Sequence, residues 1–210
     1  MAKSNVKKAA HAVEQADGAV ARAIGPHRAK AGVKALSKMS EIGDQPQMLA
    51  LSGAVLAAGL LGMATGSRAE GGRLARAGGR MLAAHVIASL AKDFVKARVD
   101  RTRPRAMLAG KGGHKMKKGR QTSKEETSFP SGHSAGAIAV ARAYAREYPE
   151  HRNAALAAAG LVALAQIPRA AHYPSDVATG LAIGLVAEAG VSALLDAALA
   201  TEIGSVSARS

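Results

Sequence analysis

The chain has 210 residues, enough for one domain with its own core, and carries 29 lysines and arginines against 15 aspartates and glutamates. Its formal charge of +14 favours a negatively charged partner: nucleic acid, anionic lipid or a phosphorylated substrate. The absence of cysteine excludes disulfides, thiolate catalysis and cysteine-ligated metal sites. Three tyrosines, two phenylalanines and no tryptophan are poor material for stacking on nucleic acid bases.

Residues 1–45 are predicted to form a basic amphipathic N-terminal segment. Apolar residues recur at helical spacing, and Gly25–Pro26 is expected to break the helix. Those apolar residues are Val6, Ala10, Val13, Val20 and Ile24. Such a helix either lies on a membrane surface or packs on the domain, and the residues alone do not decide between the two.

Residues 46–200 are predicted to form the main domain. Residues 48–65 are an uncharged run long enough to cross a bilayer as a helix, although their Ala and Gly content also suits a buried helix of a soluble bundle. Weaker apolar segments follow at residues 81–91, 130–141, 153–168 and 177–195. No alternating strand pattern stands out, so we predict an all-α helical bundle, integral to the membrane, with about four to six membrane helices. Residues 201–210 are expected to be a polar C-terminal tail.

A polar segment of about 25 residues, 105–129, separates two of the apolar helices, and a loop of that length is usually functional or mobile. Its lysine-rich centre is either a solvated, flexible stretch or a contact with anionic lipid.

The stretch KARVDRTRP, residues 96–104, ends an apolar helical run in a basic cluster. Lys96 and Arg103 are seven residues apart, so they would share one face if the helix continued to Pro104. Two cations directed the same way can bind an anion. A simple interfacial anchor at a helix end is the alternative.

A second stretch, FPSGHSAG at residues 129–136, suits the start of a helix. Pro130 fits the first turn, where Ser131, Gly132 and His133 would present backbone N–H groups to an anion. His133 would then be placed to exchange a proton with the bound group, although an isolated histidine near a helix start is more often structural.

The third stretch is RAAHYPSDVATG, residues 169–180. Pro174 marks another helix start, and Asp176 falls in the first turn, where a carboxylate is favoured and can turn back towards His172. That pairing would orient the imidazole and leave its other nitrogen free as an acceptor or nucleophile. A capping aspartate beside a surface histidine is the simpler alternative.

Taken together and in this order, the three stretches resemble the type 2 phosphatidic acid phosphatase (PAP2) superfamily. Its signature is Lys, six residues, Arg-Pro; then Pro-Ser-Gly-His; then Ser-Arg, five residues, His, three residues, Asp. The first two motifs are met in full, and His172 and Asp176 match the third. Gln166 stands where the family has Arg. Arg169 is expected to supply that guanidinium if the helix continues past Pro168; otherwise the site works with one cation fewer.

The resemblance implies a phosphatase that uses neither a metal ion nor another cofactor. His172, held by Asp176, would attack phosphorus to form a phosphohistidine, while His133 would protonate the leaving oxygen and later activate water. The phosphate oxygens would be bound by Lys96, Arg103, Ser131, Gly132 and Arg169.

The implied substrate is a lipid phosphate or diphosphate of the phosphatidic acid, phosphatidylglycerol phosphate or polyprenyl phosphate type. The protein is accordingly expected to be a multi-pass protein of the cell membrane, with no nucleic acid partner. The side of the membrane stays open, because the basic loop favours the cytoplasm and the family's usual orientation does not. Two alternatives are a soluble enzyme resembling vanadium haloperoxidases and a catalytically impaired protein that binds anionic lipid or nucleic acid.

Overall fold

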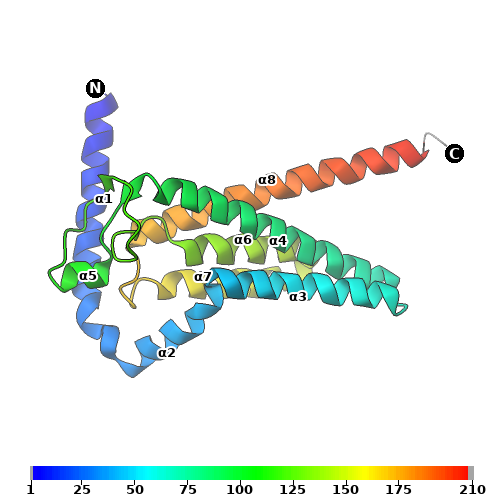
Figure 1. Cartoon of the computed structure of the whole chain (residues 1–210), viewed down its shortest axis with the longest axis horizontal. Helices are drawn as coiled ribbons and strands as arrows, with labels where there is room; N and C mark the ends of the chain where they lie inside the picture. Colours follow the sequence, from blue (N-terminus) through cyan, green and yellow to red (C-terminus); the bar gives the residue numbers. More distant parts are fainter. Residues whose placement is uncertain (1, 208–210) are drawn as a thin grey trace.

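The computed structural model describes residues 2–207, and these residues fold almost entirely into helices (Figure 1). The longer helices are α1 (Ala2–Ile24), α2 (Ala31–Ser40), α3 (Gln45–Ala64), α4 (Arg68–Lys96), α6 (Gly132–Glu147), α7 (Arg152–Ala165) and α8 (Pro174–Ser207). The shorter elements are η1 (Gly25–Ala29), η2 (Glu41–Gly43), β1 (Val99–Asp100), α5 (Pro104–Leu108), β2 (Lys117–Lys118) and η3 (Pro149–His151). The predicted all-α class is confirmed, since each strand holds only two residues.

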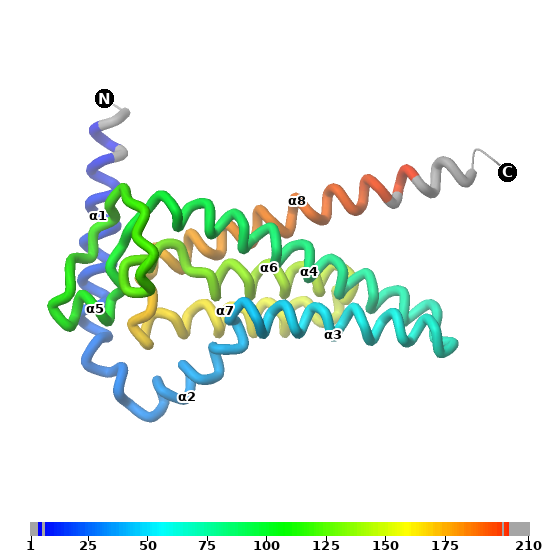
Figure 2. Tube along the Cα trace, viewed as in Figure 1, coloured from blue at the N-terminus to red at the C-terminus, as the bar shows by residue number. Residues whose placement is uncertain are grey.

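The N-terminal segment packs on the domain. Helix α1 lies crosswise to the other long helices at one end of the bundle, where it contacts α5 and α8 (Figure 2). The predicted break is confirmed, because α1 ends at Ile24 and Pro26 stands in the first turn of η1. Asp17 and Ala21 on the inner face of α1 are buried, so this helix is part of the folded unit.

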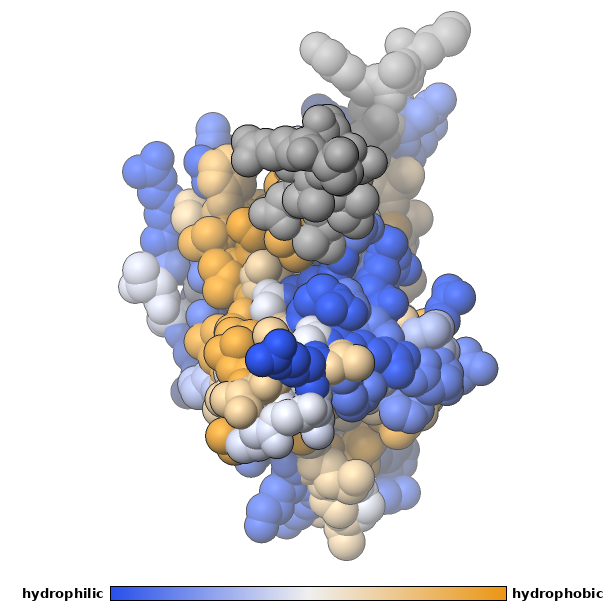
Figure 3. Space-filling view, turned by 90° about the vertical axis from the view of Figure 1, so that its right-hand side faces the viewer, coloured by the Kyte–Doolittle hydropathy of each residue, from blue (hydrophilic) through white to orange (hydrophobic). Residues whose placement is uncertain are grey.

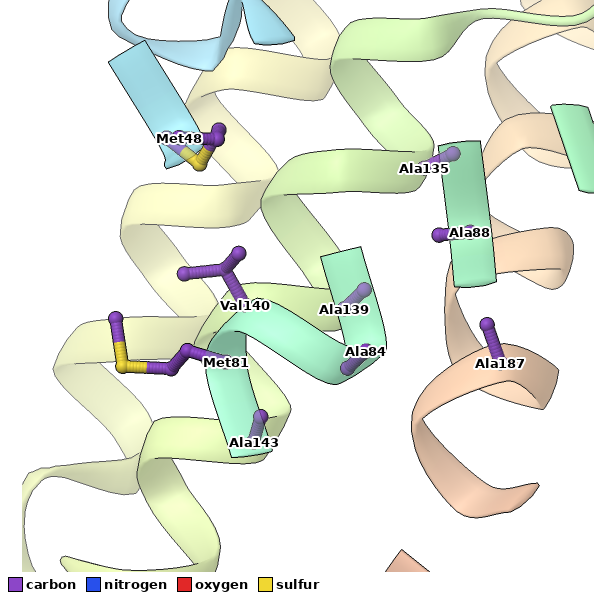
Figure 4. Packing of buried hydrophobic residues seen from close by; sticks show 9 residues of the cluster. All are labelled: Met48, Met81, Ala84, Ala88, Ala135, Ala139, Val140, Ala143 and Ala187. Carbon is purple, nitrogen blue, oxygen red and sulfur yellow. The ribbon is translucent and has the colours of Figure 1, made fainter. Parts of the chain in front are cut away.

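The core of the bundle is built from small side chains. Helices α3, α4, α6 and α8 meet around a buried cluster consisting of Met48, Met81, Ala84, Ala88, Ala135, Ala139, Val140, Ala143 and Ala187 (Figure 4). Alanine lets helix backbones approach closely, and the two methionines fill the gaps that remain between them. This packing fixes the helix ends that carry the three motifs.

The starts of α6 and α8 are held in direct contact. A Cβ added at Gly180 of α8 would lie 2.3 Å from the carbonyl oxygen of Ser131, a distance that real Cβ atoms essentially never show. The backbone N–H of Ser131 also donates to the carbonyl oxygen of Asp176 at 3.0 Å. Only glycine permits this approach, and it brings the second and third motifs together.

Two helices among the described residues are long and apolar enough to cross a membrane, Gln45–Ala64 and Pro174–Ala198. Only 17% and 33% of their apolar windows are buried inside the protein, unlike the core helix of a soluble bundle. Figure 3 shows hydrophobic residues gathered over one side of the molecule. Leu61, Leu90 and Val186 are 64%, 63% and 73% exposed. Large exposed apolar surfaces of this kind are typical of contact with lipid. The expected total of four to six membrane helices stays a prediction.

The polar segment 105–129 is more ordered than its composition indicates. It contains α5 and β2, and β2 pairs antiparallel with β1 through Val99 opposite Lys118 and Asp100 opposite Lys117. At the other end of the chain, residues 201–207 of the expected tail continue α8, and residues 208–210 lie outside the described residues.

Candidate active site

One cavity of about 340 Å³ lies at the end of the bundle where α4 ends and α6 and α8 begin. Its walls come from the η2–α3 junction, the last turns of α4, the start of α5, the start of α6 and the loop between α7 and α8. Predicted site residues from all three motifs line this cavity: Lys96, Arg103, Gly132, His133, Arg169 and His172. Segments far apart in the sequence therefore meet around one space.

The first motif places two half-buried cations in the cavity wall, although the chain does not reach them along one helix. Helix α4 ends at Lys96 and the chain turns into β1, so the condition under which Lys96 and Arg103 would share a helix face is not met. Arg103 reaches the cavity as the residue just before α5, in an extended conformation that suits a residue preceding proline. The two side chains line the same cavity because the β1 turn brings the chain back, and not because they share a helix face.

Backbone carbonyls hold these cations in place. Lys96 Nζ donates to the carbonyl oxygen of Thr127 at 2.6 Å. Arg103 Nε donates to the oxygen of Lys124 at 2.6 Å, and its Nη1 donates to the oxygen of Ala171 at 3.0 Å. Burial is the largest cause that lowers the pKa of Lys96 to about 8 and the pKa of Arg103 to about 10. Keeping both side chains charged while they are shielded from water costs free energy, and an anion entering the cavity would offset that cost.

The second motif lies at the start of α6, which begins at Gly132. Pro130 therefore precedes the helix, and the prediction that it lies in the first turn is wrong. Ser131 is the N-cap of α6, accepting hydrogen bonds from the backbone N–H of Ser134 at 3.3 Å and from the Ser134 hydroxyl at 2.9 Å. Ser131 is fully buried and does not line the cavity, so its expected role as a phosphate ligand stays a prediction. Gly132 does line it, at the first turn of a 16-residue helix whose N–H groups favour an anion.

His133 faces a carboxylate that the sequence reasoning missed. Its Nε2 lies 2.7 Å from Oδ1 of Asp44, the residue before α3, without the alignment of a hydrogen bond. Asp44 also lines the cavity. Burial is the main cause that lowers the pKa of His133 to about 4, and Asp44 opposes that shift. A bound phosphate would add its negative charge to that of Asp44 and so favour the protonated imidazole that a general acid needs.

The third motif places His172 beside both Asp176 and Arg103. His172 Nδ1 lies 3.7 Å from Asp176 Oδ2, which is beyond hydrogen-bond distance, while its Nε2 lies 3.2 Å from Arg103 Nη1. Since a guanidinium can only donate, Nε2 is the unprotonated nitrogen in this arrangement. Burial is the main cause that lowers the pKa of His172 to about 4, and Asp176 opposes that shift. The lone pair on Nε2 of this neutral imidazole accepts from Arg103 here, and it becomes available as a nucleophile when an entering phosphate takes over that donor.

Arg169 was expected to supply a second guanidinium to the site. Helix α7 ends at Ala165, so it does not continue past Pro168, which was the condition for Arg169 to supply the guanidinium. Arg169 nevertheless lines the cavity, because the chain turns after α7 with a positive φ of 53° at Ala170. Arg169 Nη1 donates to the hydroxyl of Ser40 at 2.9 Å.

Gln166 is not among the residues that line the cavity. Its side chain is fully buried, and Nε2 donates to the carbonyl oxygen of Val162 at 2.8 Å. Its own carbonyl oxygen accepts hydrogen bonds from the backbone N–H groups of Ala171 and His172 at 3.1 and 3.2 Å. Gln166 thus shapes the loop that carries His172, whereas Arg169 lines the cavity, and its expected role as a phosphate ligand stays a prediction.

Sequence reasoning also missed Lys92, His85 and Ser89, which line the cavity from α4. With Lys96 they recur at intervals of three and four residues, so they form one face of that helix. Lys92 lies close to α6, since a Cβ at Gly132 would be 3.0 Å from Lys92 Cδ. This helical spacing was a signal in the sequence that could have identified all three.

The arrangement can bind and split a phosphate ester. Cations from three separate segments surround one space that also holds a neutral imidazole and a second histidine beside a carboxylate. Phosphoryl transfer needs this combination, because charge on the equatorial oxygens must be stabilised while a nucleophile attacks and an acid protonates the leaving oxygen.

Comparisons with known proteins agree with this geometry. The chain is 46% identical over 57 residues to proteins named lipid A 1-phosphatase from Rhizobium etli and Rhizobium johnstonii. That match covers 27% of this chain and about a quarter of each relative, 25% and 23% of their lengths. The fold is similar to the crystal structure of a transmembrane PAP2 type phosphatidylglycerolphosphate phosphatase from Bacillus subtilis. The TM-score is 0.62 with 20% sequence identity, over 88% of this chain and 87% of that one.

The family model of the PAP2 superfamily matches residues 77–198, more than half of the chain. This range contains all three motifs and the helices α6 and α7, and parts of α4 and α8. The resemblance inferred from the motifs is thereby confirmed: the chain belongs to the PAP2 superfamily.

Proposed function

We propose that this protein is a membrane phosphatase that hydrolyses a lipid phosphate or diphosphate through a phosphohistidine, without a metal ion. The observation that carries the proposal is the convergence of three distant motifs on one cavity, with two cations, Lys96 and Arg103, and two histidines, His133 and His172, in its walls. Membership of the PAP2 superfamily supports the same reaction class.

In the first step, His172 Nε2 attacks phosphorus and the P–N bond forms as the P–O bond to the lipid breaks. His133, next to Asp44, gives its proton to the leaving oxygen. The bound phosphate carries negative charge, so its presence raises the proton affinity of His133 above that of the empty site. Asp176 stabilises the positive charge that develops on the His172 ring.

In the second step, His133 takes a proton from water, the hydroxyl oxygen attacks phosphorus, and the P–N bond breaks to release inorganic phosphate. Throughout both steps the three equatorial oxygens are bound by Lys96, Arg103, Arg169 and the N–H of Gly132. Arg103 binds two oxygens with its planar fork, whereas Lys96 acts as a point charge.

The substrate is a lipid phosphate in this proposal because the cavity lies at one end of a bundle that exposes large apolar residues on one side. The similar proteins are also named for lipid phosphate substrates, as a lipid A 1-phosphatase and a phosphatidylglycerolphosphate phosphatase. The protein acts from the cell membrane as a multi-pass protein. Bundle helices with apolar outer faces and a polar cavity at one end suit a substrate whose head group lies at the interface.

The test is phosphate release by the detergent-purified protein with a chelator present. Phosphatidic acid, phosphatidylglycerol phosphate, a lipid A 1-phosphate, a polyprenyl diphosphate and an aryl phosphate form the substrate panel. His172→Ala should lower kcat by about 10³-fold or more, because it removes the nucleophile. His151→Ala is the matched control, since His151 lies in η3, contacts Tyr144 and does not line the cavity.

Trapping with labelled substrate tests the intermediate directly. Label should remain on the protein at alkaline pH, be lost in acid, and be absent from the His172→Ala variant. An unchanged rate in that variant would remove the mechanism. Vanadate- and peroxide-dependent halide oxidation would favour the haloperoxidase alternative. Salt-sensitive binding to anionic lipid without hydrolysis of any substrate would favour the binding alternative.

A further inference from the structure

A buried ion cluster lies directly behind the candidate nucleophile. Arg101 Nη1 donates to Asp176 Oδ1 at 2.5 Å, and its Nη2 donates to Asp17 Oδ2 at 2.7 Å. The Arg101 and Asp176 side chains are 0% exposed, and Asp17 is 2% exposed. The guanidinium also lies over the ring of Tyr173, with its carbon 4.0 Å from the ring centre. One cation is therefore shared between two carboxylates from opposite ends of the chain.

Asp17 fixes the start of α8 as well as the guanidinium. Its Oδ1 accepts from the backbone N–H of Ser175 at 3.1 Å, and its Oδ2 accepts from the Ser175 hydroxyl. The remaining oxygen of Asp176, Oδ2, accepts from Ser128 Oγ and from the backbone N–H of Tyr173 at 3.0 Å. With every oxygen of both carboxylates engaged, the carboxylate beside His172 has one orientation.

The charge balance of this cluster depends on Asp17. Asp17, Arg101 and Asp176 together carry one net negative charge, which faces His172 from behind, while Lys96 and Arg103 face it from the cavity. Without Asp17, Arg101 would neutralise Asp176, and nothing in the cluster would balance the positive charge that forms on the imidazole when it bonds to phosphorus. In a buried cluster such a change in charge is weakly screened.

We propose that Asp17 and Arg101 are positioning residues for phosphoryl transfer, acting on His172 through Asp176. This inference rests on the proposed function and extends it to α1, which lies outside the residues 77–198 that match the family model. The N-terminal helix is then part of the catalytic machinery of this chain and not only a surface segment.

The test compares Asp17→Asn with Glu14→Gln by rapid quench with labelled substrate. Both variants remove one negative charge from α1, but Glu14 only accepts a hydrogen bond from the backbone of Met116 at 2.9 Å and does not contact Arg101. Asp17→Asn should slow formation of the phosphohistidine by about 10-fold to 100-fold with KM changed by less than about twofold, as substitutions behind a catalytic group typically do. Glu14→Gln should match the wild type, and Asp17→Glu should recover part of the rate because it restores the charge.

The same rapid-quench experiment distinguishes a positioning role of Asp17 from a role in folding, because the burst amplitude counts active sites and the burst rate constant reports the chemical step. A purely structural role of Asp17 would lower the number of active sites and leave the rate constant of the remaining sites unchanged, and that result would overturn the proposal. A rate constant for Asp17→Asn within twofold of Glu14→Gln would also overturn it. If Asp17→Asn does not fold, Arg101→Lys keeps the charge but cannot bridge both carboxylates, and it should show the same loss of rate.

Failure of the proposed function is visible before any variant is made. If the wild type hydrolyses no phosphate in the panel, the proposed function fails and this inference falls with it. If the wild type is active and Asp17→Asn behaves as the wild type, only the inference on α1 fails.

Discussion

Replacing Gly180 by alanine should separate the two histidines without touching either of them. The new Cβ would lie 2.3 Å from the carbonyl oxygen of Ser131, whereas ordinary contacts begin at 3.4 Å. The starts of α6 and α8 must therefore move apart by about 1 Å, because the obstacle is backbone and cannot rotate away. His133 lies in the first turn of α6 and His172 lies just before α8, so the distance between the two histidines changes by a similar amount. A misplacement of that size costs about 100-fold in rate.

The assay is kcat on the best substrate of the panel, together with thermal unfolding in detergent. Gly190→Ala on the same helix is the matched control, since nothing lies within 4 Å of its added Cβ. That variant should keep its activity and gain up to about 1 kcal/mol of stability from the lower flexibility of alanine. If Gly180→Ala keeps kcat within twofold of Gly190→Ala, the close contact between α6 and α8 does not set the catalytic geometry.

Two further predictions concern charge in the cavity. The ratio kcat/KM should fall as pH drops through about 4, where buried His172 gains a proton and loses its lone pair. On the alkaline side, two groups lose protons that the reaction needs. One is His133, whose pKa burial lowers to about 4 in the empty site and the bound phosphate raises, and the other is Lys96, which loses its charge as pH rises through about 8. Lys96→Arg should raise the pH at which kcat/KM falls on the alkaline side, whether or not the maximal kcat/KM is lower. If that pH does not change, Lys96 is not the group whose loss of charge causes the fall. Arg169→Ala should lower kcat/KM by about 100-fold because it removes a phosphate ligand, whereas Gln166→Leu should change it by less than about threefold. Equal losses in these two variants would show that Arg169 does not replace the family arginine.

The sequence brought together residues that line one cavity, although it did not predict the local structure that places them there. Lys96 and Arg103 were paired because a continuous helix would put them on one face, and that helix does not exist. The end of α4 at Lys96 depends on two contacts with later parts of the chain. Strand β1 pairs with β2, whose residues lie 17 or more positions after their partners, and Lys96 donates to the carbonyl oxygen of Thr127. Contacts of that range leave no periodic signal in the sequence, so the spacing identified the residues while missing the turn that brings them together.

The two helix starts were predicted with unequal accuracy. Pro174 begins α8 as expected, whereas α6 begins at Gly132, after Pro130, with Ser131 as its N-cap. Both signals are local, since a cap or a proline acts within one turn. The end of α7 at Ala165 was missed because it depends on the loop carbonyl of Gln166, which accepts the N–H groups of two later residues. Such a loop is specified by tertiary contacts and not by neighbouring side chains.

The least predictable part of the site is the ion cluster behind it. Arg101 lies inside the first motif, two residues before Arg103, and nothing in the spacing separates an arginine that binds substrate from one that is buried. The two arginines differ in their partners in the structure. Arg101 forms ion pairs with two carboxylates, whereas Arg103 donates hydrogen bonds to backbone carbonyls and to an imidazole. A guanidinium already neutralised by carboxylates cannot serve phosphate as well. The arginine whose pKa burial lowers to about 10 is therefore the one left to bind an anion.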